Sequence, residues 1–203
     1  MTLPTVSDEQ AKAIQEVVKA LRGVGSFFEK ALGSVPEDLV GMLGGDWLKI
    51  RRAENIAAMM QRAKRRLEAR GKEPEPASLS IALPILRAAA DESREQLQEI
   101  WARLLANAMD TDRTNRVREA FTEAAKRLEP LDALVLTNVR KHATSIDGHL
   151  SNVLANELGV ERDEIDVSVH NLLKLEMLTP LDIGRTASAM SAFGREFLRA
   201  IED

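Results

Sequence analysis

The chain has no cysteine and no tyrosine, and only 3% of its 203 residues are aromatic. The absence of cysteine excludes disulfides, thiolate nucleophiles and cysteine-ligated zinc. The shortage of aromatic side chains argues against a surface on which unpaired nucleic-acid bases would stack. Alanine, leucine, glutamate and arginine dominate instead, and this composition favours helices over sheets.

Long apolar runs are also missing. No run approaches the ~18 residues that a membrane-spanning helix needs, and the first ten residues lack the basic and apolar regions of a signal peptide. We therefore expect a cytoplasmic protein. Its hydrophobic fraction of 44% and charged fraction of 30% are ordinary for a chain that folds around a core. Its length allows one large domain or two small ones.

The sequence carries no recognisable catalytic or metal-binding motif. The three histidines are His142, His149 and His170. None of them lies in an H-E-x-x-H pattern. The pair Asp110 and Asp112 begins like a calcium loop, but the later positions fail. Asn115 and Phe121 replace the glycine and the glutamate that such a loop requires. We predict a non-enzymatic protein without a cofactor or a metal.

Three acidic residues, Glu92, Glu95 and Glu99, come close together in the sequence. A pair of catalytic acids would need burial or close neighbours to shift a pKa. We expect these three side chains to be solvated on a charged helix face.

Apolar residues recur with helical periodicity along much of the chain. We predict helices over residues 37–70 and 79–90. Gly71 is a suitable terminator for the first of them. Pro84 is tolerable in the second only near its first turn, because proline lacks the amide hydrogen that later positions need.

The most regular apolar stripe lies between residues 97 and 108. Its members are Leu97, Ile100, Trp101, Leu104, Leu105 and Ala108. We expect them to be core residues of a helix that begins with a capping box of Ser93 and Gln96. A further stripe follows at Val117, Phe121, Ala124 and Leu128.

Positive charge gathers in one part of the chain. Residues 46–72 hold nine Lys and Arg against three Asp and Glu, a balance of +6, whereas residues 130–203 hold seven against twelve, a balance of −5. At 100° per residue, four arginines of the basic part fall within a sector of about 80° that lies largely off the apolar seam. They are Arg52, Arg62, Arg66 and Arg70, with Arg51 close by.

We call these five arginines the basic stripe. They are predicted to contact phosphates, an acidic lipid surface or an acidic protein. The alternative is a solvated face, or one that pairs with the acidic C-terminal part of the same chain.

Residues 23–45 hold six of the eleven glycines among apolar side chains. Glycine weakens helices, so we expect this segment to be broken or adaptable. It includes Gly41-x-x-x-Gly45, a spacing at which membrane helices pack closely. The segment could dock a partner or insert at a membrane interface, and packing in the core is the simpler alternative.

From Pro130 onward the pattern resembles a winged helix. It predicts three helices (131–142, 150–158 and 163–177), two extended stretches around a glycine tip, and a closing helix from Phe193. The third helix would enter the major groove in DNA-binding members. Here it begins Asp163-Glu-Ile-Asp and offers only Lys174 as a positive charge, with Arg185 at the tip. We therefore favour protein contact over DNA recognition.

The fold class that follows is mainly α. An irregular helical domain, residues 1–129, precedes a small winged-helix-like (α+β) domain, residues 130–203.

The segment from about residue 39 to residue 130 resembles the abortive infection alpha family of bacterial proteins. The resemblance lies in Arg51-Arg to Lys64-Arg-Arg-Leu-Glu-Ala-Arg-Gly, in Glu73-Pro-Glu-Pro with Leu83-Pro-Ile-Leu, and above all in Leu97-Gln-Glu-Ile-Trp-Ala-Arg-Leu-Leu-Ala-Asn-Ala-Met-Asp. It implies a role in defence against phage by stopping the growth of an infected cell. A winged-helix-like part often follows in such sequences. The family offers no catalytic residues to carry over.

We therefore expect a phage-defence protein that acts by binding a protein or another macromolecule. The contact residues proposed from the sequence are the basic stripe, Lys174 and Arg185. Two alternatives stay open: a winged-helix regulator that binds nucleic acid, and a membrane-active effector that uses residues 23–45. The apolar stripes also allow a homo-oligomer.

Overall fold

The computed structural model describes residues 24–32, 46–142, 145–181 and 187–203. The chain divides by its contacts into two compact units, which we describe separately. The first unit comprises residues 1–119 together with Asp203, and the second comprises residues 120–202. The predicted domains, 1–129 and 130–203, stay a prediction, because a division by contacts does not show where independently folding domains begin.

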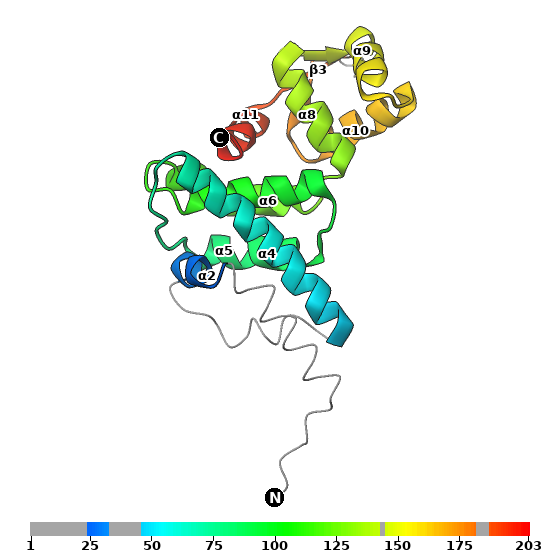
Figure 1. Cartoon of the computed structure of the whole chain (residues 1–203). Helices are drawn as coiled ribbons and strands as arrows, with labels where there is room; N and C mark the ends of the chain where they lie inside the picture. The colour runs from blue at the N-terminus through cyan, green and yellow to red at the C-terminus, as the bar shows by residue number, and fades with distance from the viewer. Residues whose placement is uncertain (1–23, 33–45, 143–144, 182–186) are drawn as a thin grey trace, which may run out of the picture. The chain divides into compact units, whose positions relative to one another are not determined.

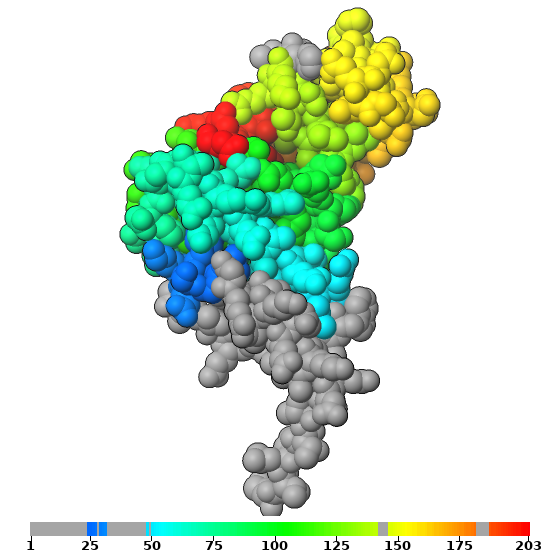
Figure 2. All heavy atoms as spheres, in the orientation of Figure 1, coloured from blue at the N-terminus to red at the C-terminus, as the bar shows by residue number. Residues whose placement is uncertain are grey.

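The first unit is helical. Its described elements are α2 (Gly25–Leu32), α4 (Asp46–Ala69), α5 (Leu79–Asp91), α6 (Glu95–Ala108) and the short 3₁₀ helix η1 (Thr114–Arg116). The long helix α4 packs against both α5 and α6, and Figure 1 shows it lying across them. In the space-filling view, α4 forms a continuous band over one face of this unit (Figure 2).

The helix predicted over 37–70 is present as α4 from Asp46 onward, and residues 37–45 lie outside the described ranges. Gly71 follows the helix with a φ of 65°, a left-handed conformation that glycine adopts without strain. The predicted helix over 79–90 is confirmed as α5. None of the helices in the described ranges combines the length and the apolar composition needed to cross a membrane.

The core of the first unit lies between α4 and α6. Trp101 is 2% exposed, and Leu97, Ile100, Leu104 and Leu105 are buried with it, as the sequence predicted. Opposite them, α4 contributes the buried side chains Ile56, Met59, Met60, Ala63 and Leu67. Each large apolar side chain that is fully buried contributes about 1.5–3 kcal/mol to stability, so this seam fixes the two helices against each other.

Two local predictions for α5 and α6 are wrong. Helix α6 has Arg94 at its N-cap without a side-chain bond, so Ser93 and Gln96 form no capping box. Pro84 is the sixth residue of α5, beyond the first turn. A proline there leaves the carbonyl of Ser80 without its helical donor, and Ser80 is exposed, so water can satisfy that oxygen.

The second unit combines helices with a small sheet. Its elements are α7 (Glu119–Ala125, which begins at the boundary), α8 (Pro130–His142), β1 (Ser145–Asp147), α9 (Gly148–Leu158), α10 (Arg162–Lys174), β2 (Leu178–Pro180), β3 (Ala187–Met190) and α11 (Ala192–Ala200). The three strands pair antiparallel in the order β1-β3-β2. The predicted helices are present, and β2 and β3 lie in the two predicted extended stretches. Helix α10 ends three residues earlier than expected. Strand β1 was not predicted.

The core of the second unit gathers around Phe121. Its ring meets Phe193 and Phe197 edge-on, with centroids 5.2 and 5.9 Å away, the geometry that aromatic quadrupoles favour. Gly194 lets α11 approach the turn before β2, since a Cβ there would stand 2.1 Å from the carbonyl oxygen of Met177. The predicted stripe of Val117, Phe121, Ala124 and Leu128 is buried throughout.

Candidate functional site

The basic stripe lies on α4, and carboxylates of the same unit face most of it. Nε of Arg52 donates to Asp91 at 2.6 Å, and Arg51 lies 3.5 Å from Glu54 on its own helix. Farther along, Nη2 of Arg62 stands 3.5 Å from the carboxylate of Glu95.

The end of α4 continues the pattern. Arg66 forms ion pairs with Glu99 and with Asp203. Nη1 of Arg70 donates to Asn107 at 2.7 Å and lies 3.4 Å from Asp110. Glu95 and Glu99 on α6 follow the same order as Arg62 and Arg66 on α4, as expected for two helices that run side by side in one direction.

Most of the paired carboxylates come from the end of α5, from α6 and from the turn after it. The sequence left open a solvated face or pairing with the acidic C-terminal part of the chain. In the structure most partners lie between residues 54 and 110, and Asp203 is the partner from the C-terminal end. The role of Arg51, Arg52, Arg62, Arg66 and Arg70 as contacts for a partner stays a prediction.

Arginines outnumber carboxylates at the C-terminal half of α4. A groove of about 560 Å³ opens there. It is lined by Arg62, Arg65, Arg66, Ala69, Arg70, Glu95, Glu99 and Asp203. We call it the arginine groove. The sequence singled out three of its four arginines, and Arg65 belonged to the same basic run without lying in the stripe.

Burial and crowding lower the pKa values of two arginines in this groove, Arg66 and Arg70. Burial lowers the pKa of Arg66 to about 10, helped by the positive charges of Arg103, Arg70, Arg62 and Arg65. Burial and Arg113 likewise lower the pKa of Arg70, against the effect of Asp110. All of these guanidinium groups remain charged at neutral pH, so the groove holds concentrated positive charge.

Glu92 does not behave as the sequence suggested. It is only 9% exposed, and its carboxylate accepts bonds from the backbone amide of Arg94 at 2.8 Å and from its Nε at 3.0 Å. Burial raises the pKa of Glu92, but the bonds from Arg94 outweigh it and hold the pKa below its ordinary value. This residue closes the turn between α5 and α6 and is not a free acid.

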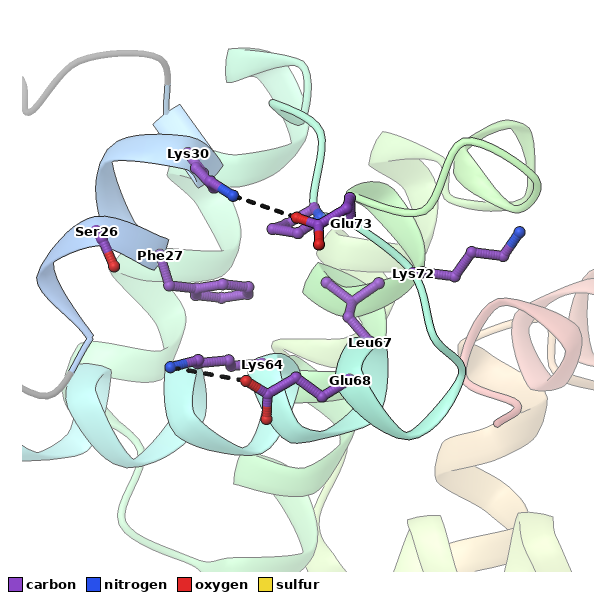
Figure 3. A pocket seen from close by; sticks show the side chains of 9 residues that line it. Ser26, Phe27, Lys30, Lys64, Leu67, Glu68, Lys72 and Glu73 are labelled. Atoms are coloured by element: carbon purple, nitrogen blue, oxygen red, sulfur yellow. Dashed lines mark hydrogen bonds and ion pairs between the residues drawn. The ribbon is translucent and has the colours of Figure 1, made fainter.

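A smaller pocket of about 150 Å³ lies where α2 meets α4. Figure 3 shows Phe27 and Leu67 between two ion pairs, Lys30 with Glu73 at 3.4 Å and Lys64 with Glu68 at 3.7 Å. Because Phe27 and Leu67 are almost fully buried, they close its floor as core residues.

This pocket contains part of the glycine-rich segment. Within the described residues 24–32, Val24, Phe27 and Ala31 are buried, so their side chains pack in the core. Residues 23 and 33–45 lie outside the described ranges.

In the second unit, a groove of about 640 Å³ runs between α8 and α10. Its charged residues are Arg127, Glu129, Asp132, Asp163, Glu164 and Lys174. Two apolar side chains, Leu131 and Val167, lie among them, and Val167 is 70% exposed. We call this the α8–α10 groove.

The α8–α10 groove includes one of the two cations predicted at the C-terminal end. Lys174 lies exposed on its rim, and Arg185 lies outside the described ranges. Sequence reasoning missed Leu131 and Val167, because an apolar residue at helical spacing is normally assigned to the core. Among the described residues, no group of three possible metal ligands converges.

The sequence model for abortive infection alpha matches residues 51–186. The match extends the resemblance seen in the sequence, which stopped near residue 130, through most of the second unit. Comparison with curated proteins finds no match, and comparison with solved structures finds none either. Since the matched residues make up well over half of the chain, and α4, α5, α6 and α10 all fall within them or nearly so, the chain belongs to the abortive infection alpha family.

Proposed function

We propose that this protein acts in abortive infection without catalysis, by binding a protein partner through the α8–α10 groove. Family membership supports the role in phage defence. The observation that carries the mode of action is the exposed face of α10, which places the apolar Val167 beside acidic side chains.

A winged-helix assignment for the second unit is part of this proposal. The elements follow the order helix, strand, two helices, strand, strand, and the sheet order is β1-β3-β2. In this assignment α10 is the third helix, the one that DNA-binding members insert into the major groove.

Charge on α10 supports protein contact over DNA contact. Asp163, Glu164 and Asp166 are exposed near its N-terminus, where they would repel phosphates and cancel the favourable end of the helix dipole. An exposed apolar side chain within an acidic rim is typical of a site that a protein partner covers.

The non-enzymatic part of the proposal rests on what the charged groups do. In the described part of the chain, arginines and carboxylates with shifted pKa values bond to one another or to the backbone. Such groups serve structure or binding, whereas an acid–base catalyst needs a group poised to exchange a proton near neutral pH.

The test compares Val167→Lys with Leu79→Lys in phage infections at low and high phage-to-cell ratio. Both positions are exposed apolar residues on helices, at 70% and 52%, so neither change should unfold the protein. We expect the wild-type protein to protect the culture at low ratio and to permit collapse at high ratio. Val167→Lys should lose protection, and Leu79→Lys should keep it.

The alternatives predict different outcomes. A nucleic-acid reader would gain duplex affinity from the extra lysine at position 167, and that affinity would fall steeply with salt. A membrane effector would co-sediment with anionic vesicles irrespective of position 167. Protection that survives Val167→Lys would contradict the proposed surface. A homo-oligomer remains a prediction that sedimentation of the purified protein can check.

A further inference from the structure

The arginine groove of the first unit carries more positive charge than its own carboxylates neutralise. Its lining holds four arginines, Arg62, Arg65, Arg66 and Arg70. The acids of the lining are Glu95, Glu99 and Asp203. Four positive charges against three negative ones leave a balance of +1 among the lining residues at neutral pH.

The available acids are shared between arginines. Glu99 pairs with both Arg66 and Arg103, the latter at 2.9 Å. Asp110 lies 3.4 Å from Arg70 and 3.8 Å from Arg113. Each carboxylate carries one negative charge, so a carboxylate shared by two guanidinium groups offsets only half of their combined positive charge.

Two arginine nitrogens in the groove wall, Nε of Arg66 and Nε of Arg65, donate no hydrogen bond to these carboxylates. Nε of Arg66 is buried without an acceptor among the described residues. Nε of Arg65 donates to the carbonyl of Gln61 on its own helix, at 3.3 Å. Arg65 is exposed, so the end of its guanidinium group can turn toward a ligand.

We propose that the arginine groove binds a small phosphate-bearing anion, held chiefly by Arg62 and Arg65. A guanidinium group presents two parallel donors that match the oxygens of a phosphate. Residues three apart on a helix are neighbours on its surface, so Arg62 and Arg65 can hold one phosphate group together. An anionic ligand would offset the positive charge that the lining carboxylates leave.

The size of the groove supports a small ligand. Its volume of about 560 Å³ lies within the range of about 300–1,000 Å³ that small-molecule sites occupy. The arginine groove shares no residue and no helix with the α8–α10 groove. A test of one proposal therefore does not decide the other.

The test measures pyrophosphate binding to the full-length protein by calorimetry, at an ionic strength held constant with chloride. The groove variant is Arg62→Gln with Arg65→Gln. The matched control is Arg51→Gln with Lys64→Gln, which removes the same charge from α4 outside the groove. We expect affinity to fall by about tenfold or more in the groove variant, since each lost charge-assisted bond costs about a factor of ten. The control should stay within about twofold.

The single variant Arg65→Gln controls for misfolding of the double variant. It should not unfold the protein, because Arg65 bonds to Gln61 within its own helix. It should still weaken pyrophosphate binding. A nucleoside triphosphate that binds more tightly than tripolyphosphate would identify a nucleotide as the source of the phosphate, whereas equal affinities would identify the phosphates alone. Absence of saturable binding, an equal loss in the control variant, or saturation by duplex DNA only would each overturn the proposal.

Discussion

At the scale of single residues, bonding partners decide what a charged side chain does. Glu92 is buried, and burial alone would raise the pKa of its carboxyl. The bonds from Arg94 reverse that direction and lower it. A lowered pKa in the folded state means that the native protein favours the ionised form more than the unfolded chain does.

A pH prediction follows for Glu92. Its stabilisation is fully present above the ordinary glutamate pKa of about 4.5 and is lost as the pH falls through the lowered folded-state value. Glu92→Gln should therefore flatten the decline of the unfolding free energy below about pH 4.5. Urea unfolding between pH 3 and pH 7 measures this, with the exposed Glu75→Gln as control. A slope identical to that of the wild type would show that Arg94 does not hold the carboxylate.

At the scale of elements, the packing of α4 against α5 and α6 places carboxylates of very different exposure against arginines. Asp110 is 1% exposed and faces Arg70 and Arg113, whereas Asp91 is 58% exposed and faces Arg52. Removing one partner of a buried pair leaves an uncompensated charge, at a cost of about 3–5 kcal/mol. An exposed pair is worth about 0.2–1 kcal/mol.

Asp110→Ala should therefore lower the unfolding free energy by about 3 kcal/mol, and Asp91→Ala by less than about 1 kcal/mol. Chemical denaturation of the two variants measures both. The bond between Arg52 and Asp91 is short, at 2.6 Å. If distance and not burial set the cost, Asp91→Ala would therefore be the more damaging change. If Asp91→Ala proved the more damaging change, burial would not be the deciding factor.

Sequence periodicity predicts the helices but not which of their faces meet. The stripe from Leu97 to Ala108 was recognisable because a 3.6-residue repeat marks one buried side. The partners that Arg62 and Arg70 find in Glu95 and Asp110 lie 33 and 40 positions away in the chain, and no local pattern links them. Strand β1 has only three residues, too few for alternation to be seen. Val167 was missed because its spacing is that of a core residue.

At the scale of the whole molecule, the two proposed sites lie on separate compact units. The arginine groove is built from α4 and α6 with Asp203, and the α8–α10 groove from α8, α10 and the turn before α8. The family match, residues 51–186, covers every lining residue of both grooves except Asp203. A protein that recognises a small anion on one unit and a protein on the other has the two sites that regulation of one binding event by another requires.

The last prediction separates binding at each site from coupling between them. Substitutions that share no partners usually act independently, so Val167→Lys should leave pyrophosphate affinity within about twofold of wild type. Arg62→Gln with Arg65→Gln should weaken pyrophosphate binding by about tenfold or more. The effect of this double variant on phage protection then reports whether the anion matters for defence. If Val167→Lys itself shifted pyrophosphate affinity by tenfold, a coupling free energy of about 1.4 kcal/mol would join the two sites, and linkage would require pyrophosphate to change the affinity for the protein partner by the same factor.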